Sequence, residues 1–471
     1  MFSFSSIDQY HAGLSAGSFT CVQAVQHYLS AIEAQRDLNC YLEVFAREAL
    51  ERAALLDAMP SRSGSLHGVV IGIKDNICYK DHKVTAGSKM LGGFTSVYSA
   101  TAVERLLSEG AIIIGRQNCD EFGMGSTNEN SAYGPVLNPV DKTRVPGGSS
   151  GGSAVAVKAG LCMAALGSDT GGSVRLPADF CGVVGLKPGY GRVSRHGLIA
   201  YGSSFDQIGV LAGSVQDAAI VLEAIAGPDD FDSTAMSQPP GSFKNGIDKD
   251  SYRLAYFPEW INHPSMDPEI RKQLQDFIAG LQAKGHSVTP VHFSLTDYIV
   301  PAYYILTTAE ASSNLARYDG ARFGYRSAKP AENLDFFYRH NRTEGFGKEV
   351  KRRIMLGTFV LSTGYFDAYF TKAQQVRAQL LQQTKLIFNQ FDFLLAPNAP
   401  LTASKKGELN KDPVAMYMAD IFTVFANLVG IPAISLPLFK HSYNLPFGLQ
   451  VLCSPQDEVS LLRFSHQLMQ Q

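Results

Sequence analysis

The sequence predicts an α/β protein with a large, largely parallel or mixed β-sheet. Short apolar runs typical of buried strands alternate along the chain with longer runs of helical periodicity. The 471 residues are 45% hydrophobic and 18% charged, which is enough apolar material for a large core. At roughly 150 residues per domain the length allows two or three domains. Because internal repeats, low-complexity tracts and long linkers are absent from the sequence, we favour one large domain.

The N-terminal 60 residues predict helices. Thr20 could cap a helical run over residues 21–32, and a second run over residues 46–59 ends at a proline. We therefore expect residues 1–60 to form a helical segment packed on the core. Residues 61–471 are then expected to form the single domain.

The remaining elements follow from the same alternation. Apolar runs bounded by turn residues predict strands at residues 69–73, 111–115, 163–166, 253–257, 288–293, 391–396, 432–436 and 447–453. Helical spacing or composition predicts helices at residues 103–107, 153–159, 267–284, 371–388 and 458–469. The Pro- and Gly-containing stretch at residues 238–242 is the best candidate for a loop or subdomain boundary.

Composition excludes several classes of protein. A formal net charge of −2 argues against a dedicated nucleic-acid-binding surface. Seven scattered cysteines without a CxxC pair indicate reduced thiols. The sequence contains no cluster of His and Cys residues that would predict a metal site. The first residues lack a secretory signal pattern, and no apolar run approaches the length of a membrane span. We expect a cytoplasmic protein, or its equivalent in an organelle matrix, that does not enter a membrane.

Three polar side chains in the first 175 residues predict acyl-transfer chemistry. Lys74 ends the apolar run at residues 69–73, and Ser149 and Ser173 lie in two dense Gly/Ser clusters. Together they could supply an amine base, a hydroxyl relay and a hydroxyl nucleophile, which suffices for acyl transfer without a histidine. Burial after a strand would lower the pKa of Lys74, provided that the neighbouring Asp75 points away.

The second cluster also predicts an oxyanion hole. Glycines let the backbone approach a ligand closely, so successive amides can point at one spot where negative charge develops. The expected donors are the amides of four consecutive residues, Thr170, Gly171, Gly172 and Ser173.

Two other interpretations of the first cluster remain open on the residues alone. Gly147-x-Ser149-x-Gly151 also matches the nucleophile elbow of α/β-hydrolases, in which Ser149 attacks and a histidine is the base. Such a loop could instead cradle a phosphate, although it lacks the Lys-Ser/Thr pair of a P-loop.

The two clusters together resemble the amidase signature family. The resemblance rests on GGSSGGSAVAVKAGL at residues 147–161 and ALGSDTGGSVRLPADFCGVVGLKP at residues 165–188, and it extends over residues 24–451. It implies the amidase signature fold, a large mixed sheet with helices on both faces, with a signature core at about residues 69–215.

The resemblance also assigns roles within the motif. It implies that Ser173 is the nucleophile and that Ser149, on a cis peptide, passes the proton to Lys74. Ser150 is expected to support this network. Asp169 and Arg175 are expected to buttress the loop.

Within the family, further segments resemble the glutamine-hydrolysing subunits of tRNA-dependent amidotransferases. These are DEFGMGS at residues 120–126, RVSR at 192–195, SSFDQIG at 203–209, EASSNL at 310–315 and EGFGKEVKRR at 344–353. The resemblance implies that free glutamine is held by Tyr304, Arg353 and Asp420. An arginine fork suits the α-carboxylate and an aspartate suits the α-ammonium.

The same resemblance implies partners. The ammonia would pass to a kinase-like B subunit, which binds ATP and Mg²⁺ and most of the misacylated Glu-tRNA(Gln) or Asp-tRNA(Asn). A small C subunit would clasp the other two, and this chain itself would need no cofactor. The alternatives are a stand-alone amidase for other small amides and a non-enzymatic glycine-loop protein that binds anions.

Overall fold

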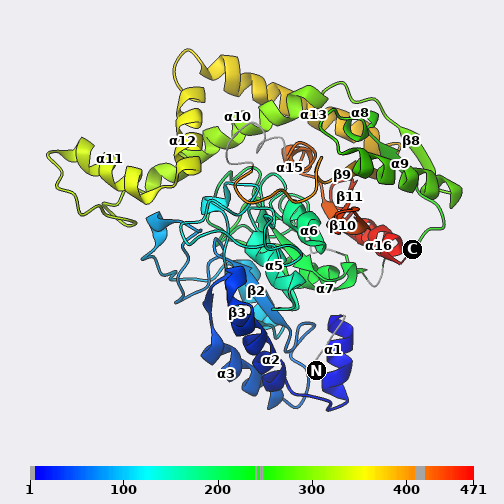
Figure 1. The fold of residues 1–471 in the computed structure, drawn as a ribbon, viewed down its shortest axis with the longest axis horizontal. Coiled ribbons are helices and arrows are strands. Elements are labelled where there is room, and N and C mark those ends of the chain that lie inside the picture. Colours follow the sequence, from blue (N-terminus) through cyan, green and yellow to red (C-terminus); the bar gives the residue numbers. More distant parts are fainter. Residues whose placement is uncertain (1–5, 239–240, 244–245, 247, 409–419, 471) are drawn as a thin grey trace.

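The computed structural model describes residues 6–238, 241–243, 246, 248–408 and 420–470, and an 11-stranded sheet runs through them (Figure 1). The strands lie in the order β1-β3-β2-β4-β6-β5-β10-β11-β9-β7-β8. Their bounds are β1 Tyr41–Val44, β2 Val70–Lys74, β3 Ile112–Gln117, β4 Ala164–Asp169, β5 Val184–Lys187, β6 Gln207–Ala212, β7 Arg253–Tyr256, β8 Ser287–Pro290, β9 Phe393–Pro397, β10 Ala433–Lys440 and β11 Pro446–Cys453.

The sheet is mixed, as expected. β2 pairs in parallel with β3 and β4, and β7 pairs in parallel with β8 and β9. The other neighbours are antiparallel. All eight predicted strands are present, with shifted ends, whereas β1, β5 and β6 were not predicted.

Helices surround the sheet, and Figure 1 shows α11 projecting away from the body. Their bounds are α1 Ile7–Ser15, α2 Cys21–Ala34, α3 Ala46–Asp57, α4 Thr101–Ser108, α5 Gly151–Lys158, α6 Arg175–Cys181, α7 Val215–Ile225, α8 Pro258–Ile261, α9 Pro268–Ala283, α10 Thr296–Asn314, α11 Leu334–Gly345, α12 Lys348–Val360, α13 Lys372–Phe388, α15 Val424–Leu428 and α16 Glu458–Met469.

Both faces of the sheet are covered by apolar cores, because successive side chains of a strand point to opposite faces. On β3, Ile113 belongs to the larger core, whereas Ile112 and Ile114 belong to the second core. Neighbouring β2 shows the same alternation between Val70 and Ile71. The strands at the centre are therefore buried on both sides.

The N-terminal segment contains the two predicted helices and also a strand. The Thr20 hydroxyl accepts a hydrogen bond from the Gln23 amide at 3.2 Å, which caps α2 as expected. The expectation of a purely helical segment is corrected, because Tyr41–Val44 forms β1 and pairs with β3 at the edge of the sheet. Four residues without clear polar–apolar alternation gave no strand pattern to detect.

The two halves of the chain meet inside the same sheet, where β5 pairs with β10. Of the predicted boundary at residues 238–242, residues 239 and 240 lie outside the described residues. Among the helices that the structure describes, none is long and apolar enough to cross a membrane. All seven cysteines are free thiols and buried.

Candidate active site

Lys74 is the last residue of β2 and its side chain is fully buried. Its amine Nζ lies 2.7 Å from Ser149 Oγ, 2.9 Å from Ser150 Oγ and 2.9 Å from Ser168 Oγ. The amine is thus surrounded by hydroxyl groups rather than by carboxylates. Lys74, Ser149 and Ser150 are brought together as the sequence predicted, and Ser168 is an additional partner.

Asp75 points away from this amine, as a neutral Lys74 requires. Its carboxylate accepts hydrogen bonds from the amides of Thr85 and Gly87 and pairs with Arg116. Burial lowers the pKa of Lys74 to about 8, because the low-dielectric surroundings disfavour the ammonium form. Near neutral pH, Lys74 is therefore a neutral amine far more often than an exposed lysine is.

The first glycine-serine cluster lies between this amine and the start of α5. The Gly148–Ser149 peptide bond is cis, as the family resemblance implied. The Ser150 hydroxyl donates to the Ser168 carbonyl oxygen at 3.1 Å, so its lone pairs face the Lys74 amine. Ser150 occupies the supporting position that was expected of it.

Ser173 adjoins this cluster from the second glycine-serine cluster. The Ser150 amide donates to the Ser173 carbonyl oxygen at 3.0 Å, which ties the two clusters together. The side chain of Ser173 is 9% exposed. Within the described residues its hydroxyl makes no hydrogen bond, including none to Ser149, so it is available to a ligand.

The structure corrects one of the four predicted oxyanion-hole donors. The Gly172 amide donates to Asp169 Oδ1 at 2.8 Å, so it is already used inside the loop. In the part of the chain that the structure describes, the amides of Thr170, Gly171 and Ser173 donate to no other group. Gly172 has instead a conformational role: its φ of +128° is one that other residues rarely adopt, and a Cβ there would collide with Thr423.

Asp169 and Arg175 hold this loop from beneath, as expected. Both are fully buried, and Arg175 Nη2 lies 3.0 Å from Asp169 Oδ1. Although burial alone would raise the pKa of Asp169, the Arg175 guanidinium lowers it to about 2. Arg175 also donates to the Thr423 carbonyl oxygen and to Asn427 and Gln450, which anchors the loop to the C-terminal part of the chain.

The three predicted substrate-binding residues also converge. The Tyr304 hydroxyl, from α10, donates to Asp420 Oδ2 at 3.2 Å. The Arg353 guanidinium, from α12, lies over the Tyr304 ring at 5.5 Å. Burial raises the pKa of Asp420 to about 7, although its hydrogen bond from Ser126 and the charge of Arg353 oppose this.

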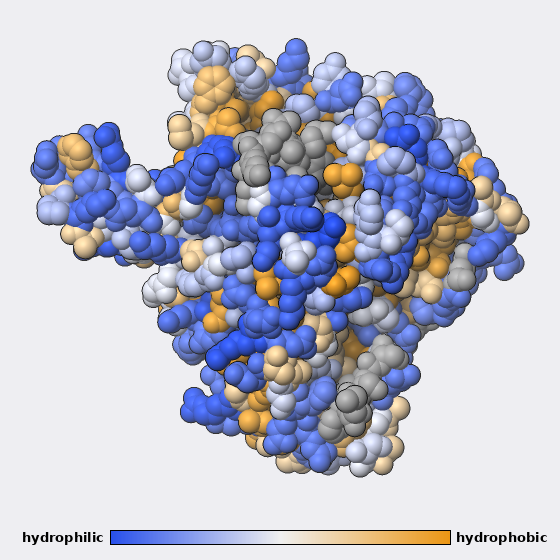
Figure 2. Space-filling view, viewed as in Figure 1, coloured by the Kyte–Doolittle hydropathy of each residue, from blue (hydrophilic) through white to orange (hydrophobic). Residues whose placement is uncertain are grey.

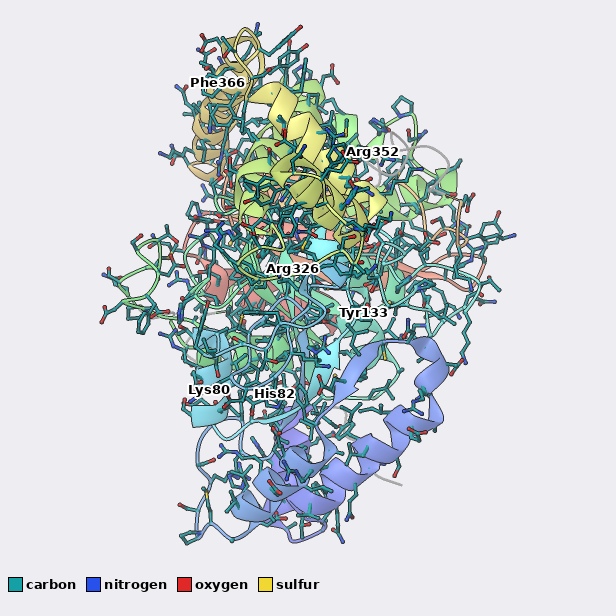
Figure 3. All side chains as sticks on the ribbon, turned by 90° about the vertical axis from the view of Figure 1, so that its left-hand side faces the viewer. Lys80, His82, Tyr133, Arg326, Arg352 and Phe366 are labelled. Atoms are coloured by element: carbon teal, nitrogen blue, oxygen red, sulfur yellow. The ribbon has the colours of Figure 1, made fainter. Side chains whose placement is uncertain are left out.

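Two residues that the sequence analysis missed hold Arg353. Its Nε lies 2.9 Å from Glu349 Oε1, and its Nη1 donates to the Tyr201 hydroxyl at 2.7 Å. Arg353 is 3% exposed, whereas the side chain of Arg352, labelled on α12 in Figure 3, is 31% exposed. The two neighbouring arginines of α12 therefore differ, and only Arg353 is buried in the site.

Thr423 connects the substrate-binding residues to the nucleophile loop. Its hydroxyl donates to the Gly171 carbonyl oxygen at 2.7 Å, and its amide donates to the Asp420 carbonyl oxygen at 3.1 Å. Asp420 thus lies one turn before Thr423, which contacts the loop of the predicted oxyanion hole. Asn76, two residues after Lys74, donates to Ser168 Oγ at 2.9 Å and extends the network around the amine.

Comparison with known proteins shows the family of this chain. The model of the family described as Amidase matches residues 23–462. The chain belongs to the amidase family. It is therefore an amidase-family enzyme, and the partner of Ser149 is Lys74 rather than the histidine of an α/β-hydrolase elbow.

Relatives of this amidase include the A subunit of a glutamyl-tRNA(Gln) amidotransferase from Chlorobium phaeobacteroides. It is 49% identical, and the match covers 98% of this chain and 97% of the relative. The crystal structure of the A subunit of the glutamyl-tRNA(Gln) amidotransferase from Thermotoga maritima is similar with a TM-score of 0.77 and 39% identity, covering 93% of this chain and 89% of that chain. A crystal structure described as an amidase gives a TM-score of 0.83 at 28% identity, covering 99% of each chain.

No group of three or more His, Cys, Asp or Glu side chains among the described residues could hold a metal ion. The groups that this amidase site presents are hydroxyl, amine and backbone amide groups. The sequence analysis missed residues that hold the predicted site residues in place. These are Ser168 and Asn76 near the Lys74 amine, and Tyr201 and Glu349 at the Arg353 guanidinium. Only Asn76 had a signal, since strand alternation places it on the side of Lys74.

Proposed function

We propose that this chain hydrolyses glutamine to glutamate and ammonia, as the glutaminase subunit of a tRNA-dependent amidotransferase. The observation that carries the proposal is the convergence of Tyr304, Arg353 and Asp420 beside the nucleophile loop. A positive and a negative group at one end, with a nucleophile at the other, suit a substrate that has a zwitterionic end and a distal amide. Relatives named as A subunits of glutamyl-tRNA(Gln) amidotransferases support the role in an amidotransferase.

The zwitterionic end of glutamine is matched by charge. Arg352 and Arg353 share the carboxylate of Glu349, so these three side chains together carry one net positive charge that can face the α-carboxylate. Asp420 supplies the opposite charge for the α-ammonium. An ammonium ion next to Asp420 favours its ionised form, so binding and ionisation of this carboxyl are coupled.

The reaction begins when Ser173 Oγ attacks the side-chain amide carbon. Its proton passes to Ser149, whose own proton passes to the neutral amine of Lys74. The hydrogen bond from Ser173 to Ser149 forms when substrate binds, since catalytic contacts commonly tighten in the substrate complex. The amides of Thr170, Gly171 and Ser173 stabilise the oxyanion.

The tetrahedral intermediate then collapses and the carbon–nitrogen bond breaks. Lys74 returns the proton through Ser149 to the departing nitrogen, which leaves as ammonia. Water attacks the glutamyl ester, with the same relay accepting its proton, and glutamate leaves as Ser173 regains its hydroxyl hydrogen. The protons taken up and released over the two steps balance, so the cycle uses no cofactor bound to this chain.

We propose further that the ammonia passes to a partner, the B subunit of the complex. There ATP and Mg²⁺ would activate misacylated Glu-tRNA(Gln) or Asp-tRNA(Asn) for amidation, and a small C subunit would hold the other two together in the cytoplasm. An exposed apolar surface supports a partner, since monomers seldom expose contiguous patches of this kind. It lies over α12 and the turn to α13, at the top of Figures 2 and 3, and comprises Met355, Leu356, Phe359, Tyr365, Phe366 and Tyr369.

The test is ammonia release from glutamine by this chain copurified with its B and C subunits, with and without ATP and misacylated tRNA. Ser173→Ala should abolish release. Ser153→Ala is the matched control, because Ser153 lies in the first glycine-serine cluster, beside the site, but donates to the Leu166 carbonyl oxygen at 3.2 Å, away from the amine. Stimulation of release by ATP and tRNA is expected.

A stand-alone amidase is the second candidate, because related structures include an enzyme described only as an amidase. Turnover of aliphatic or aryl amides by the chain alone, without release of ammonia from glutamine, would replace the proposal by this candidate. Absence of labelling of Ser173 by a fluorophosphonate would instead favour a non-enzymatic glycine-loop protein.

A further inference from the structure

Asp206 lies immediately before β6 and is buried, with 3% exposure. Its two carboxylate oxygens accept three hydrogen bonds from two different segments. Oδ1 accepts from the Thr170 hydroxyl at 2.6 Å. Oδ2 accepts from the amides of Tyr201 and Gly202 at 2.9 and 3.0 Å. One carboxylate therefore joins the segment that begins the oxyanion hole to the loop that contains Tyr201.

Tyr201 is the partner of Arg353. Its hydroxyl accepts from Arg353 Nη1 at 2.7 Å, and its ring lies 5.4 Å from the guanidinium. The Tyr201 carbonyl oxygen accepts from Asn314 Nδ2 at 3.1 Å, so α10 holds the same loop from the other side. We call Arg353 and Tyr201 together the carboxylate clamp. A continuous chain of contacts runs from this clamp through Asp206 to Thr170.

We propose that Asp206 is a positioning residue that fixes the distance between the carboxylate clamp and the oxyanion hole, and thereby selects glutamine over asparagine. The inference rests on the proposed function, because it takes the α-carboxylate of glutamine as the group that the clamp binds. The two amino acids differ by one methylene between the α-carbon and the amide. A fixed distance therefore places the amide carbon of only one of them at Ser173.

The geometry suits a spacer of fixed length. Burial raises the pKa of Asp206 to about 6, which still leaves it ionised and acceptor-only at neutral pH. Buried hydrogen bonds to a charged group are strong, and they leave both segments little freedom to shift. A misplacement of about 1 Å can cost about 10²-fold in rate, which is the scale on which one methylene is discriminated.

The test is the ratio of kcat/KM for glutamine to kcat/KM for asparagine, measured on the complex with its B and C subunits. Asp206→Ala removes both tethers, and Thr170→Val removes only the hydrogen bond to the oxyanion segment with little change of shape. We expect the ratio to fall at least tenfold in both variants. A general loss of oxyanion stabilisation would lower the rates for both amides by one factor and leave the ratio unchanged.

Asp217→Ala is the matched control. Asp217 is also a buried carboxylate that accepts a backbone amide from a distant segment, that of Ile7 at 2.9 Å, but it lies on α7 away from the site. Its ratio should equal that of the wild type. If Asp206→Ala does not fold, Thr170→Val decides alone.

An unchanged ratio in active, folded Thr170→Val overturns the inference and leaves the proposed function intact. Failure of the wild-type complex to release ammonia from glutamine overturns the proposed function, and this inference with it. The two failures are therefore distinguishable in one set of measurements.

Discussion

At the residue scale, the amine of Lys74 is held by hydroxyl groups from two segments that are 75 and 94 residues away along the chain. The groups that raise its pKa by charge, Cys119 first and then carboxylates such as Asp120 and Asp169, offset only part of the effect of burial. The pKa of about 8 is therefore a property of the folded site, and the pH dependence of the reaction should report it.

The first prediction concerns Lys74. Below pH 8 the ammonium form predominates and cannot accept the proton, so kcat at saturating glutamine should rise about tenfold per pH unit up to pH 8 and then level off. Saturating glutamine is needed because bound substrate keeps Asp420 ionised, so that titration of Asp420 does not contribute to the pH dependence of kcat. Initial rates of ammonia release between pH 6 and 10 measure this. A kcat that is constant from pH 6 to 8 would contradict the role of Lys74 as a base.

The second prediction concerns Asp420, whose pKa is raised to about 7 by burial. Only the ionised form attracts the α-ammonium of glutamine, so KM for glutamine should rise as the pH falls through 7, and Asp420→Asn should give a high KM that is independent of pH. The monoamide of glutaric acid, which lacks the ammonium group, is the control. A rise of its KM with the same midpoint would show that Asp420 is not the cause.

The sequence predicted these groups because each belongs to a local pattern or to the family resemblance. It did not predict Tyr201, which is 152 residues from Arg353 and lies in a loop without periodicity. It wrongly assigned the Gly172 amide to the oxyanion hole, because the return of the loop onto Asp169 depends on tertiary packing. Local residue patterns predict neither contacts between residues far apart in sequence nor the direction of individual backbone amides.

At the element scale, the site is built from strand ends and helix starts. Lys74 ends β2, Asp169 ends β4, and α6 begins at Arg175 directly after the nucleophile loop. Strands with long apolar runs were predicted, but β5 and β6 were not. β5 has only four residues, and both strands include a glycine and are buried throughout, so they show no polar–apolar alternation.

The third prediction concerns α12. Arg353→Lys keeps the charge but loses the planar fork, so KM for glutamine should rise at least tenfold while kcat changes by less than about threefold. Arg352→Lys, on the same helix and paired with the same glutamate, is the matched control and should leave both constants nearly unchanged. Steady-state kinetics decide. Equal effects of the two substitutions would remove the distinction between the buried and the exposed arginine.

The fourth prediction concerns the buried pair beneath α6. Arg175→Met leaves the Asp169 carboxylate buried without its partner, which should lower the free energy of unfolding by about 3–5 kcal/mol. Lys272→Met breaks an exposed pair of 2.6 Å on α9 and should cost less than about 1 kcal/mol. Urea unfolding monitored by circular dichroism compares the two variants.

The same pair gives a pH dependence of stability. The pKa of Asp169 is lowered to about 2 in the folded state, against about 3.9 in an unfolded chain. Its contribution is therefore complete above pH 4 and is lost as the pH falls toward 2. Arg175→Met should be less sensitive than the wild type over this interval, and equal acid sensitivity would contradict the argument.

At the scale of the whole molecule, one sheet joins both halves of the chain and carries a core on each face. The predicted fold class is confirmed, including the mixed sheet and the helices on both faces. The division into residues 1–60 and 61–471 remains a prediction. Within the first segment, Tyr10 and Cys21 are fully buried, so its packing on the rest is extensive.

The fifth prediction follows from that packing. Deletion of residues 1–60 removes β1 from the edge of the sheet and uncovers apolar side chains of β3, including Ile112 and Ile114. We expect the truncated chain to be insoluble or to lose its cooperative thermal transition. A soluble fragment whose Ser173 still reacts with a fluorophosphonate would show instead that residues 61–471 fold independently.

The link from Arg175 to Gln450 has a consequence for synthesis of the protein. The two residues are 275 positions apart, and at roughly 5–20 residues per second a ribosome needs about 14–55 s to travel between them. During that time Ser173 has left the ribosome, but its loop lacks the side chains that lock it. The nucleophile loop of a nascent chain therefore cannot be locked until nearly the whole length has emerged, and we expect the chain to gain its activity only at that point.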